Sequence, residues 1–310
     1  MTDYANNLNR VFIEQLQDPS MKKVAEERSM AYLKQRVYED SFLERIIPSK
    51  PISPSQCDRA ESSATSPTLL RKIIDKEFTD VAATAMDFRG KGDYKFVETD
   101  TYPVDFFKIE SEEFHITEGE LRAKEQPVQS LIKHHTAREI QEVMDTVFNT
   151  ALIAIVTAAP VGTQDIAVAD DIVLPSNITE LRNLLDGRGN LGNPLVASTL
   201  LMTQAQFNQV DTWIQSGIDN ALTADFWRDG YQYDHLLRLR VVKTIKSNLV
   251  PNNHVWGFTA PEFLGHHLTF NDDRFQIRTE WDDIAWKAWK THGAAIGNNL
   301  AVVRLRLGEA

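Results

Sequence analysis

A glycine-rich segment at residues 187–192 has the spacing of a phosphate-binding loop. It reads Gly-Arg-Gly-Asn-Leu-Gly, which matches the pattern G-x-G-x-x-G. In a dinucleotide-binding fold, such glycines let the backbone approach a pyrophosphate at a helix N-terminus, and an acidic residue such as Asp211, roughly twenty residues on, binds the ribose. Here the flanking pattern is reversed, because a helix-like segment precedes the loop and a strand-like one follows it. A glycine-rich surface loop is the better interpretation.

Two histidine pairs could in principle bind a metal ion. His134 and His135 lie in a long helical pattern, and Glu139 follows His135 by one turn. Residues four positions apart share one face of a helix and can share a metal ion. No cysteine or second carboxylate–histidine pair is placed to complete such a site, so a solvated helix face is favoured. The same interpretation holds for His266 and His267, which follow a glycine.

Two further clusters are better explained by solvation and packing than by chemistry. The acidic segments 110–113 and 118–120 could supply paired carboxylates for acid–base catalysis. Charged strand edges that prevent aggregation are the simpler explanation. Trp281, Trp286 and Trp289 could form a stacking platform for nucleic-acid bases. Packing in a core or an interface is favoured, because no basic residues interleave with them to form a stripe.

Composition narrows the classes of function. The chain has 310 residues, of which 42% are hydrophobic and 25% charged, as in an ordinary globular protein. Its net charge of −11 argues against a dedicated nucleic-acid binder, whose surface should be basic. A negative wall around a packed genome is compatible with this charge, because it would keep the nucleic acid from adhering.

Targeting and redox features predict a soluble product made in the cytosol. Cys57 is the single cysteine, which forbids an intrachain disulfide and fits a reducing compartment. Residues 1–10 have no apolar core, so no signal peptide is expected. The longest apolar stretch, 151–159, is far shorter than the ~18 residues of a membrane span. We expect no catalytic, cofactor or metal site and no association with a membrane.

The N-terminal part of the chain predicts a helical arm and a linker. Apolar residues recur with helical spacing over 9–47, with a break at Asp18 and Pro19. Asp18 is expected to cap a second helix that begins at Pro19. Residues 48–67 are rich in proline and serine and are expected to form a linker without order of its own.

Residues 68–117 are typical of β structure and predict an extended hairpin. Its glycine-rich tip holds Arg89, Lys91 and Asp93, which are candidate contacts to another subunit. An isolated two-stranded ribbon is marginal in water, so the hairpin is expected to lie on a neighbour. The type of the first arm, 69–80, stays open. The return arm is expected at 94–98, 102–109 and 113–116.

The strongest helical pattern lies within residues 118–158. Apolar residues recur with helical spacing from Pro127 to Val156, and the pattern stops before Pro160. About thirty residues with a rise of ~1.5 Å each predict a rod of ~45 Å. A coiled coil is not favoured, because the heptad repeat is not sustained.

Helical and strand patterns alternate over residues 160–265, as in a mixed α/β region. Leu195 begins an apolar run that is typical of a buried strand, and Thr203 can cap the helix that follows. The expected helices are 178–185 and 204–217, the expected strands are 195–202, 237–245 and 254–258, and 261–265 is a short turn or helix.

The last forty residues carry the most distinctive pattern. Residues 274–280 alternate polar and apolar side chains and predict a half-buried strand. A tryptophan-rich connection follows, and then a turn of small residues at 292–299. Residues 300–307 predict a closing strand, in which Val303 and Leu305 face the same way.

The order of elements is arm, linker, hairpin, long helix, α/β region and closing strands. With the segments quoted below, this order resembles the major capsid proteins of tailed bacteriophages, whose fold encapsulins share. The resemblance covers most of the chain from about residue 68. Its most specific segments are Val-Pro-Asn-Asn-His at 250–254, Ala-Pro-Glu-Phe-Leu-Gly at 260–265, the turn at 293–299, and the strand-to-helix step from 200–203 into 205–207.

The resemblance implies an α+β fold, namely the tailed-phage major capsid fold. Its parts would be an N-terminal arm and linker, an extended β-hairpin loop, a peripheral domain built on a long spine helix, and an axial α/β domain. In that order they would comprise residues 1–67, residues 68–117, residues 118–164 with 266–310, and residues 165–265.

The resemblance also implies a structural subunit and not an enzyme. Copies of the chain would form the hexamers and pentamers of an icosahedral head around double-stranded DNA, without sequence-specific contact. Scaffold, portal and decoration proteins are the further partners implied, and the location is the virion after assembly in the host cytoplasm. The hairpin tip would overlap an adjacent subunit, and the arm 1–47 would lie on a neighbour. Two alternatives stay open: an encapsulin-like shell with protein cargo, and an enzyme that binds a nucleotide at 187–192.

Overall fold

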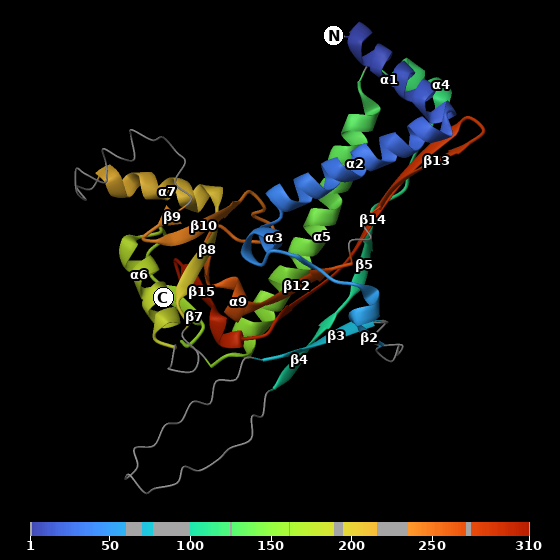
Figure 1. Cartoon of the computed structure of the whole chain (residues 1–310). Coiled ribbons are helices and arrows are strands. Elements are labelled where there is room, and N and C mark those ends of the chain that lie inside the picture. Colours follow the sequence, from blue (N-terminus) through green and yellow to red (C-terminus); the bar gives the residue numbers. More distant parts are fainter. Residues whose placement is uncertain are drawn as a thin grey trace, which may run out of the picture. The chain divides into compact units, whose positions relative to one another are not determined.

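The structure, a computed structural model, divides into two units (Figure 1). Unit 1 comprises Met1–Leu70, Asp105–Phe148 and His267–Ala294, and unit 2 comprises Arg71–Val104, Asn149–His266 and Ala295–Ala310. The described residues are 2–59, 70–76, 100–124, 126–160, 162–188, 195–215, 235–270 and 274–309.

The N-terminal segment folds as three helices of unit 1. They are α1 (Thr2–Gln17), α2 (Pro19–Asp40) and α3 (Phe42–Ile46). The Asp18 carboxylate accepts hydrogen bonds from the Ser20 backbone N–H at 2.9 Å and from its hydroxyl at 2.7 Å. These bonds lower the pKa of Asp18. The predicted helix break, with Asp18 as the cap, is confirmed.

The first helix packs on unit 1 of its own chain. Phe12 is buried and stacks on Trp286, with 6.4 Å between the ring centroids. The Asn9 side-chain amide donates to the backbone carbonyls of Lys124 and Gln126. Phe12, Ile13 and Leu16 of α1 are therefore buried within one chain, and contact of the arm with a neighbour stays a prediction.

The predicted linker is ordered where the structure describes it. β1 (Lys50–Pro51) runs parallel to β12 (Gly265–Thr269). The expectation of a linker without order is wrong for 48–59, because backbone pairing with a distant strand needs no apolar side chain. Residues 60–67 lie outside the described residues. The other elements here are the 3₁₀ helix η1 (Pro54–Gln56) and β2 (Asp58–Arg59).

The structure describes the predicted hairpin at its base. β3 (Leu70–Asp75) and β4 (Thr101–Asp105) are neighbours in a small sheet. The Lys76 N–H donates to the Asp100 carbonyl at 2.6 Å. The first arm, whose type the sequence left open, is therefore a strand, and residues 77–99 lie outside the described residues.

A long strand, β14 (Asp283–Ile296), is central to the six-stranded sheet of unit 1. β13 (Arg274–Glu280) pairs antiparallel with it, from Arg274 opposite Trp289 to Glu280 opposite Asp283. The strand predicted at 274–280 is confirmed with the same bounds. β5 (Phe107–Glu110) and β6 (Phe114–Thr117) also pair antiparallel with β14, and β12 is a further neighbour of it in the sheet.

After that strand, the sequence predicted a tryptophan-rich connection and a turn of small residues. This prediction is wrong up to residue 296, because the segment forms the strand β14. Trp286, Ala288, Lys290 and His292 are buried and alternate with partly exposed residues, as a strand requires. Lysine and histidine occupy two of these buried positions. Burial therefore alternates along β14 with the two-residue period of a strand, although some of the buried residues are not apolar.

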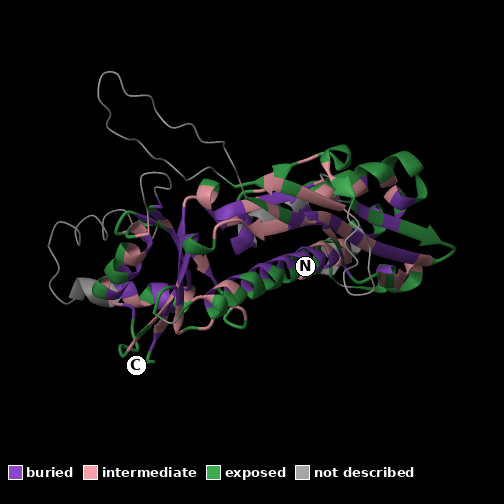
Figure 2. Ribbon diagram, turned by 90° about the horizontal axis from the view of Figure 1, so that it is seen from below, coloured by how far each residue is buried: buried purple, intermediate pink, exposed green. Residues whose placement is uncertain are grey.

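The long helix that the sequence predicts is α5 (Val128–Ala158). Its 31 residues span ~46 Å. Met144 and Leu152 belong to a buried stripe, and Figure 2 shows exposed residues along the remainder of the helix. Among the described helices, α5 is long and apolar enough to cross a membrane. This is weak evidence for a membrane span, because the core helix of a soluble protein can have the same length and composition. The shorter helix α4 (Glu118–Ala123) precedes it.

Unit 2 is built on a mixed six-stranded sheet. The helices and strands predicted over 160–265 are confirmed, with bounds that shift by at most a few residues. Thr203 caps the second helix as expected, since its hydroxyl accepts from the Gln206 N–H at 3.3 Å. The strand order is β7 (Asp165–Val168), β15 (Val302–Leu307), β11 (His254–Thr259), β8 (Ala197–Thr203), β10 (Leu239–Thr244) and β9 (His235–Leu236). The helices and turns are α6 (Pro175–Asp186), α7 (Gln204–Gln215), α9 (Pro261–Leu264) and η2 (Asn299–Ala301).

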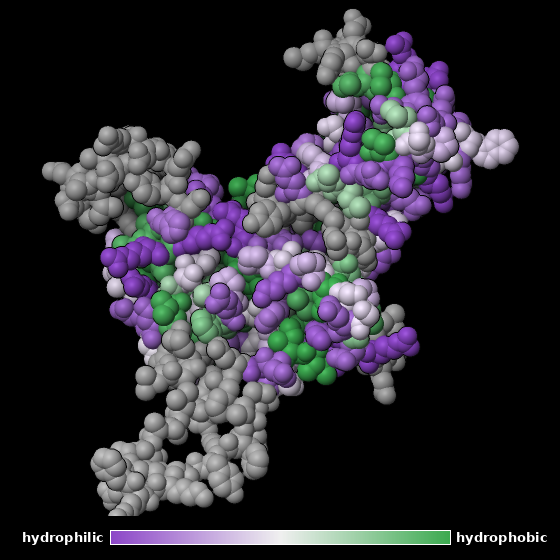
Figure 3. Space-filling view, in the orientation of Figure 1, coloured by the Kyte–Doolittle hydropathy of each residue, from purple (hydrophilic) through white to green (hydrophobic). Residues whose placement is uncertain are grey.

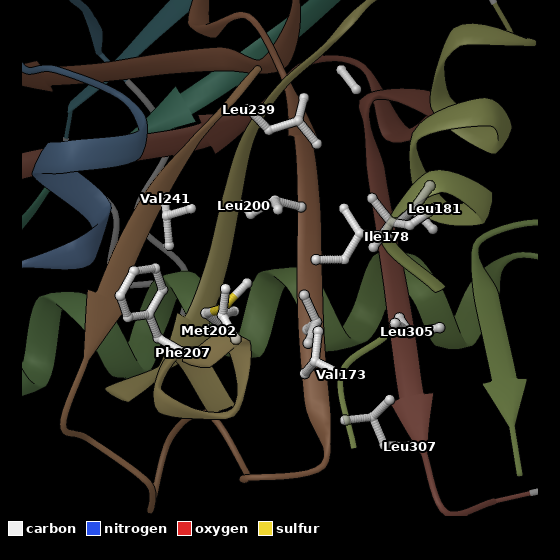
Figure 4. Close-up of a cluster of buried hydrophobic side chains, with 14 of the residues drawn as sticks. Val173, Ile178, Leu181, Leu200, Met202, Phe207, Leu239, Val241, Leu305 and Leu307 are labelled. Atoms are coloured by element: carbon white, nitrogen blue, oxygen red, sulfur yellow. The ribbon is translucent and has the colours of Figure 1, made fainter. Parts of the chain in front are cut away.

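Aliphatic side chains form the core between this sheet and its helices (Figure 4). Ile178 and Leu181 of α6 are fully buried, as are Leu200 and Leu305 of the sheet. A β-carbon at Gly257 would lie 2.2 Å from Cδ2 of Leu181, so glycine permits the close approach of α6 to β11.

The closing strand belongs to unit 2. β15 lies between β11 and β7, with Arg304 opposite Trp256 and Asp165. The predicted domain scheme places 266–310 in the peripheral domain, whereas Ala295–Ala310 clusters with unit 2. The four-part domain scheme stays a prediction.

Candidate subunit interface

The predicted contact residues Arg89, Lys91 and Asp93 lie outside the described residues. Their role at an interface stays a prediction. Candidate contact surfaces in the described part of the chain must be sought elsewhere.

The turn between β13 and β14 carries the most exposed large side chain. The strands pair up to Glu280 opposite Asp283, which leaves Trp281 and Asp282 as a two-residue turn. The relative exposure of Trp281 is 103%, whereas Trp286 is 1% exposed and Trp289 is partly buried. The expectation of core or interface packing is confirmed for Trp286 as a core residue, and Trp281 is the candidate for an interface.

The backbone of Trp281 is strained. Its φ of 56° lies in the left-handed region that normally favours glycine. A non-glycine residue held there costs on the order of 1–3 kcal/mol, and such strain is concentrated at functional positions. Tryptophan at this turn therefore needs an explanation other than turn geometry.

A groove opens beside the same hairpin, between α2 and β13. β13 is an outer strand of its sheet, and α2 lies along it (Figure 1). The Glu26 carboxylate accepts a hydrogen bond from the Ile277 backbone N–H at 2.9 Å, which covers an edge donor. The groove encloses about 480 Å³ and is lined by Lys22, Lys23, Glu26, Glu27, Met30, Arg274, Phe275, Gln276, Ile277 and Trp289.

Unit 1 also holds a cluster of buried polar side chains. The Lys290 ammonium lies 3.0 Å from a Glu44 carboxylate oxygen, and Nδ1 of His267 lies 3.6 Å from the other. His292 packs edge-on against His267, with 5.3 Å between the ring centroids, and against Phe107. The expectation that His267 lies on a solvated face is wrong, because its side chain is fully buried.

Burial dominates the protonation of this cluster. It lowers the pKa of His267 to about 4, although the Glu44 carboxylate acts in the opposite direction. Burial also lowers the pKa of His292 well below its ordinary value, and the nearby His267 and Lys290 add to this shift. Burial would raise the pKa of Glu44, but Lys290 and His267 hold it below its ordinary value. At neutral pH both imidazoles are uncharged beside an ion pair.

The glycine-rich segment does not have the setting of a phosphate loop. α6 precedes it and ends at Asp186, and the N–H of the capping residue Gly187 donates to the Asn183 carbonyl at 2.8 Å. The next described element is the strand β8, so no helix N-terminus follows the loop in the described residues. The expected reversal of helix and strand is confirmed, and residues 189–194 lie outside the described residues.

The other histidines make ordinary contacts. A ring nitrogen of His134 lies 2.9 Å from the Tyr32 hydroxyl, and Nδ1 of His266 lies 2.6 Å from the Tyr102 hydroxyl. Burial raises the pKa of Glu139, the one candidate carboxylate on the long helix. The described residues contain no group of three histidine, cysteine or acidic side chains that could hold a metal ion.

The first acidic segment lies on an exposed strand edge, as expected. Glu110 of β5 pairs with Lys108 and, at 2.8 Å, with Lys287. Hydrogen bonds from Lys108 and Lys287 lower the pKa of Glu110 to about 2. A carboxylate with this pKa stays ionised at neutral pH and cannot serve as a general acid.

The exposed side of α5 carries few charges in its second half. Val143, Val147 and Ile153 are exposed there. On the face shown in Figure 3, apolar residues form several small patches among hydrophilic ones. These patches are compatible with many small contacts between subunits.

Solved structures match this fold over most of the chain. Neither a family model nor a curated protein sequence matches the chain. "Capsid of native GTA particle computed with C5 symmetry" has a TM-score of 0.56 at 11% identity and covers 86% of this chain and 89% of its own. A structure from Microbacterium phage Oxtober96 has a TM-score of 0.59 at 10% identity, with coverages of 86% and 91%. The capsid structure of the Cyanophage P-SCSP1u has a TM-score of 0.53 at 11% identity and covers 88% of both chains.

These likenesses show the fold. The chain has the α+β fold of phage capsid proteins, as the resemblance in its sequence implied. A groove, a strained aromatic tip and a buried polar cluster are features of this chain's own residues within that fold.

Proposed function

We propose that this chain is a structural subunit of a phage head, which assembles with copies of itself into an icosahedral shell. One observation carries the proposal: the capsid fold extends over 86% or more of the chain in each of the three likenesses.

The described residues support a structural role over a catalytic one. The ionisable cluster of unit 1 is buried in a core. The glycine-rich segment follows a helix, and the acidic residue Glu110 is held ionised by lysines. We therefore infer that binding between copies, and not chemistry on a substrate, is the activity of the chain.

The finer features of assembly belong to the same proposal. Hexamers and pentamers would form the shell around double-stranded DNA, which meets an acidic chain of net charge −11 without sequence-specific contact. Arg89, Lys91 and Asp93 at the tip of the predicted hairpin would contact an adjacent copy. Scaffold, portal and decoration proteins would be the other partners, and the site of assembly would be the host cytoplasm. Apolar burial drives such interfaces, and many weak contacts suffice to hold a shell.

Electron microscopy of the purified full chain tests the proposal. The chain is fractionated by size exclusion and imaged in negative stain over a series of protein and salt concentrations. We expect closed shells, tubes, or rings of five or six subunits. A monomer or dimer that persists at high protein concentration and high salt would contradict the proposal.

The contents of the particles then distinguish between kinds of shell. Absorbance ratios and nuclease treatment of particles made in cells report packaged DNA, and mass spectrometry reports protein cargo. DNA supports the phage head, whereas a specific protein cargo without DNA would favour an encapsulin-like compartment. A melting temperature that rises with added nucleotide, and no longer does so after Gly189→Ala, would instead indicate a nucleotide-binding enzyme.

A further inference from the structure

The tip of the β13–β14 hairpin combines exposure, strain and charge. Trp281 is fully exposed in a backbone conformation that favours glycine. Glu280 and Asp282 flank it and are exposed as well. A large aromatic side chain with two acidic neighbours is the composition of an anchor that enters a partly apolar, partly basic recess.

The α2–β13 groove is a recess of that composition. Met30 and Trp289 offer apolar surface, while Lys22, Lys23 and Arg274 supply three positive charges. Two acidic residues also line the groove, and one of them, Glu26, is engaged with a backbone N–H. The chain as a whole has a net charge of −11, whereas three of the side chains that line this groove are cations.

The tip cannot enter the groove of its own chain. The groove is lined by Arg274, Phe275, Gln276 and Ile277 at one end of β13, and Trp281 follows the other end. At about 3.3 Å per residue, an extended strand keeps these positions roughly 13–23 Å apart. The occupant of the groove must therefore come from another molecule.

We propose that Trp281 of one copy inserts into the α2–β13 groove of a second copy, with Asp282 facing the lysines and Arg274. This contact rests on the proposed function, because it requires copies to meet in an assembly. Tip and groove are different surfaces, so the contact is heterologous: each copy offers its tip to the next, and the series closes into a ring when the rotation permits. The groove, at about 480 Å³, has the size of pockets that bury a bulky ligand.

Disulfide trapping between two differently labelled chains tests the contact. In a Cys57→Ser background, one chain carries Asp282→Cys, which keeps Trp281, and the other carries Gln276→Cys in the groove. The two chains are assembled together and oxidised. We expect a covalent dimer of the two different chains, because a disulfide forms only when the β-carbons approach within ~3.5–4.5 Å.

The controls separate this contact from the proposed function. Val143→Cys on the exposed side of α5 replaces the groove cysteine in a matched pair and should give at least tenfold less mixed dimer. Particles that assemble normally without the Asp282–Gln276 cross-link would overturn the contact and leave the shell function intact. If neither the native chain nor the Cys57→Ser chain assembles, the shell function is overturned, and this contact is overturned with it.

A second pair of variants separates pairing from folding. Trp281→Gly relieves the strained turn, so the melting temperature should stay the same or rise while the concentration needed for assembly rises at least tenfold. Trp281→Phe should assemble within about tenfold of the native chain. Native assembly by Trp281→Gly, or loss of both stability and assembly, would overturn the proposal, because the second result indicates a structural role.

Discussion

The two six-stranded sheets of this chain differ in the ionisable side chains that are buried against them. The core of unit 2 is aliphatic, with Leu181, Leu200 and Leu305 fully buried between helix and sheet. The sheet of unit 1 instead covers a carboxylate, an ammonium and two imidazoles, of which Glu44 and Lys290 form an ion pair at 3.0 Å. Aliphatic burial responds little to pH, whereas buried ionisable groups link folding to protonation. The two halves of the chain should therefore fail under different conditions.

Loss of the buried cation should be the most damaging change to unit 1. Lys290→Met leaves the Glu44 carboxylate buried without its partner, and breaking a buried pair costs about 3–5 kcal/mol. Hydrogen exchange followed by mass spectrometry measures the loss separately in peptides of each unit. Lys287→Met is the matched control on the same strand. Its pair with Glu110 is open to solvent and screened by it, so the expected loss is much smaller than for Lys290→Met.

Replacing both members of the pair distinguishes charge from packing. Glu44→Leu with Lys290→Met removes the two charges together, and such replacements are often neutral or stabilising. We expect the double variant to recover most of the stability lost by Lys290→Met. A double variant as unstable as the single one would show that the cluster is held by packing and would remove the contrast between the two sheets.

Truncation of the aliphatic core should damage unit 2 by a comparable amount for a different reason. Leu305→Ala removes a fully buried side chain of β15, and such a change costs about 2–5 kcal/mol through lost burial and the cavity left behind. Urea unfolding with the same peptide-resolved exchange gives the loss. Val196→Ala, at a residue that is 57% exposed, should change stability by less than about 0.5 kcal/mol.

Acid should weaken unit 1 before unit 2. The folded pKa of His267 is about 4, below the ordinary 6.5, so protonation favours the unfolded chain. The resulting loss begins as the pH falls below about 6.5 and reaches on the order of 3 kcal/mol near pH 4. In unit 2, burial would raise the pKa of Asp165, but Arg304 and Arg306 hold it below its ordinary value of 3.8. The contribution of Asp165 is therefore lost only below about pH 3.8. Burial also lowers the pKa of the half-buried His254, which adds a loss in the same direction as that of His267.

Exchange measurements at pH 7.5 and pH 4.5 test this order. His267→Gln keeps a polar side chain that does not titrate. It should reduce the pH dependence of unit 1, in which the buried His292 still titrates, and leave that of unit 2 unchanged. Equal acid sensitivity of the two units, or an unaltered profile in His267→Gln, would contradict the assignment to this histidine.

The same contrast explains what could be predicted from the sequence. Most helices and strands of unit 2 follow from apolar patterns, because their buried faces carry aliphatic residues. The short outer strands β7 and β9 were not predicted. In unit 1, β13 follows from the alternation of Phe275 and Ile277, but β14 does not, because Lys290 and His292 occupy buried positions. β1 escaped prediction since its pairing with β12 depends on backbone groups of residues far apart in the sequence.

The candidate site was only partly visible in the sequence. Three tryptophans near the C-terminus indicated a core or an interface. Trp286 and Trp289 are an odd number of positions apart, so in a strand they would lie on opposite faces, only one of which is buried. Nothing in residue types reveals that Trp281 takes a left-handed backbone conformation or that α2 lies along β13. Those facts depend on the hairpin register and on packing between helix and sheet.

The charges at the tip of the predicted hairpin should give the smallest effect. Arg89→Glu with Lys91→Glu reverses two charges that the proposed function places against a neighbour, and exposed ion pairs contribute about 0.2–1 kcal/mol each. We expect the concentration needed for assembly to rise roughly two- to thirty-fold, and less so at high salt, since salt screens exposed charges. Lys76→Glu at the base of the same hairpin is the control and should assemble normally. An effect of the double variant that persists in high salt would mean that Arg89 and Lys91 are desolvated at an interface. Their charges would then resemble the buried pair of Glu44 and Lys290 in the core. The contrast between buried and exposed charge would in that case extend to the contacts between subunits.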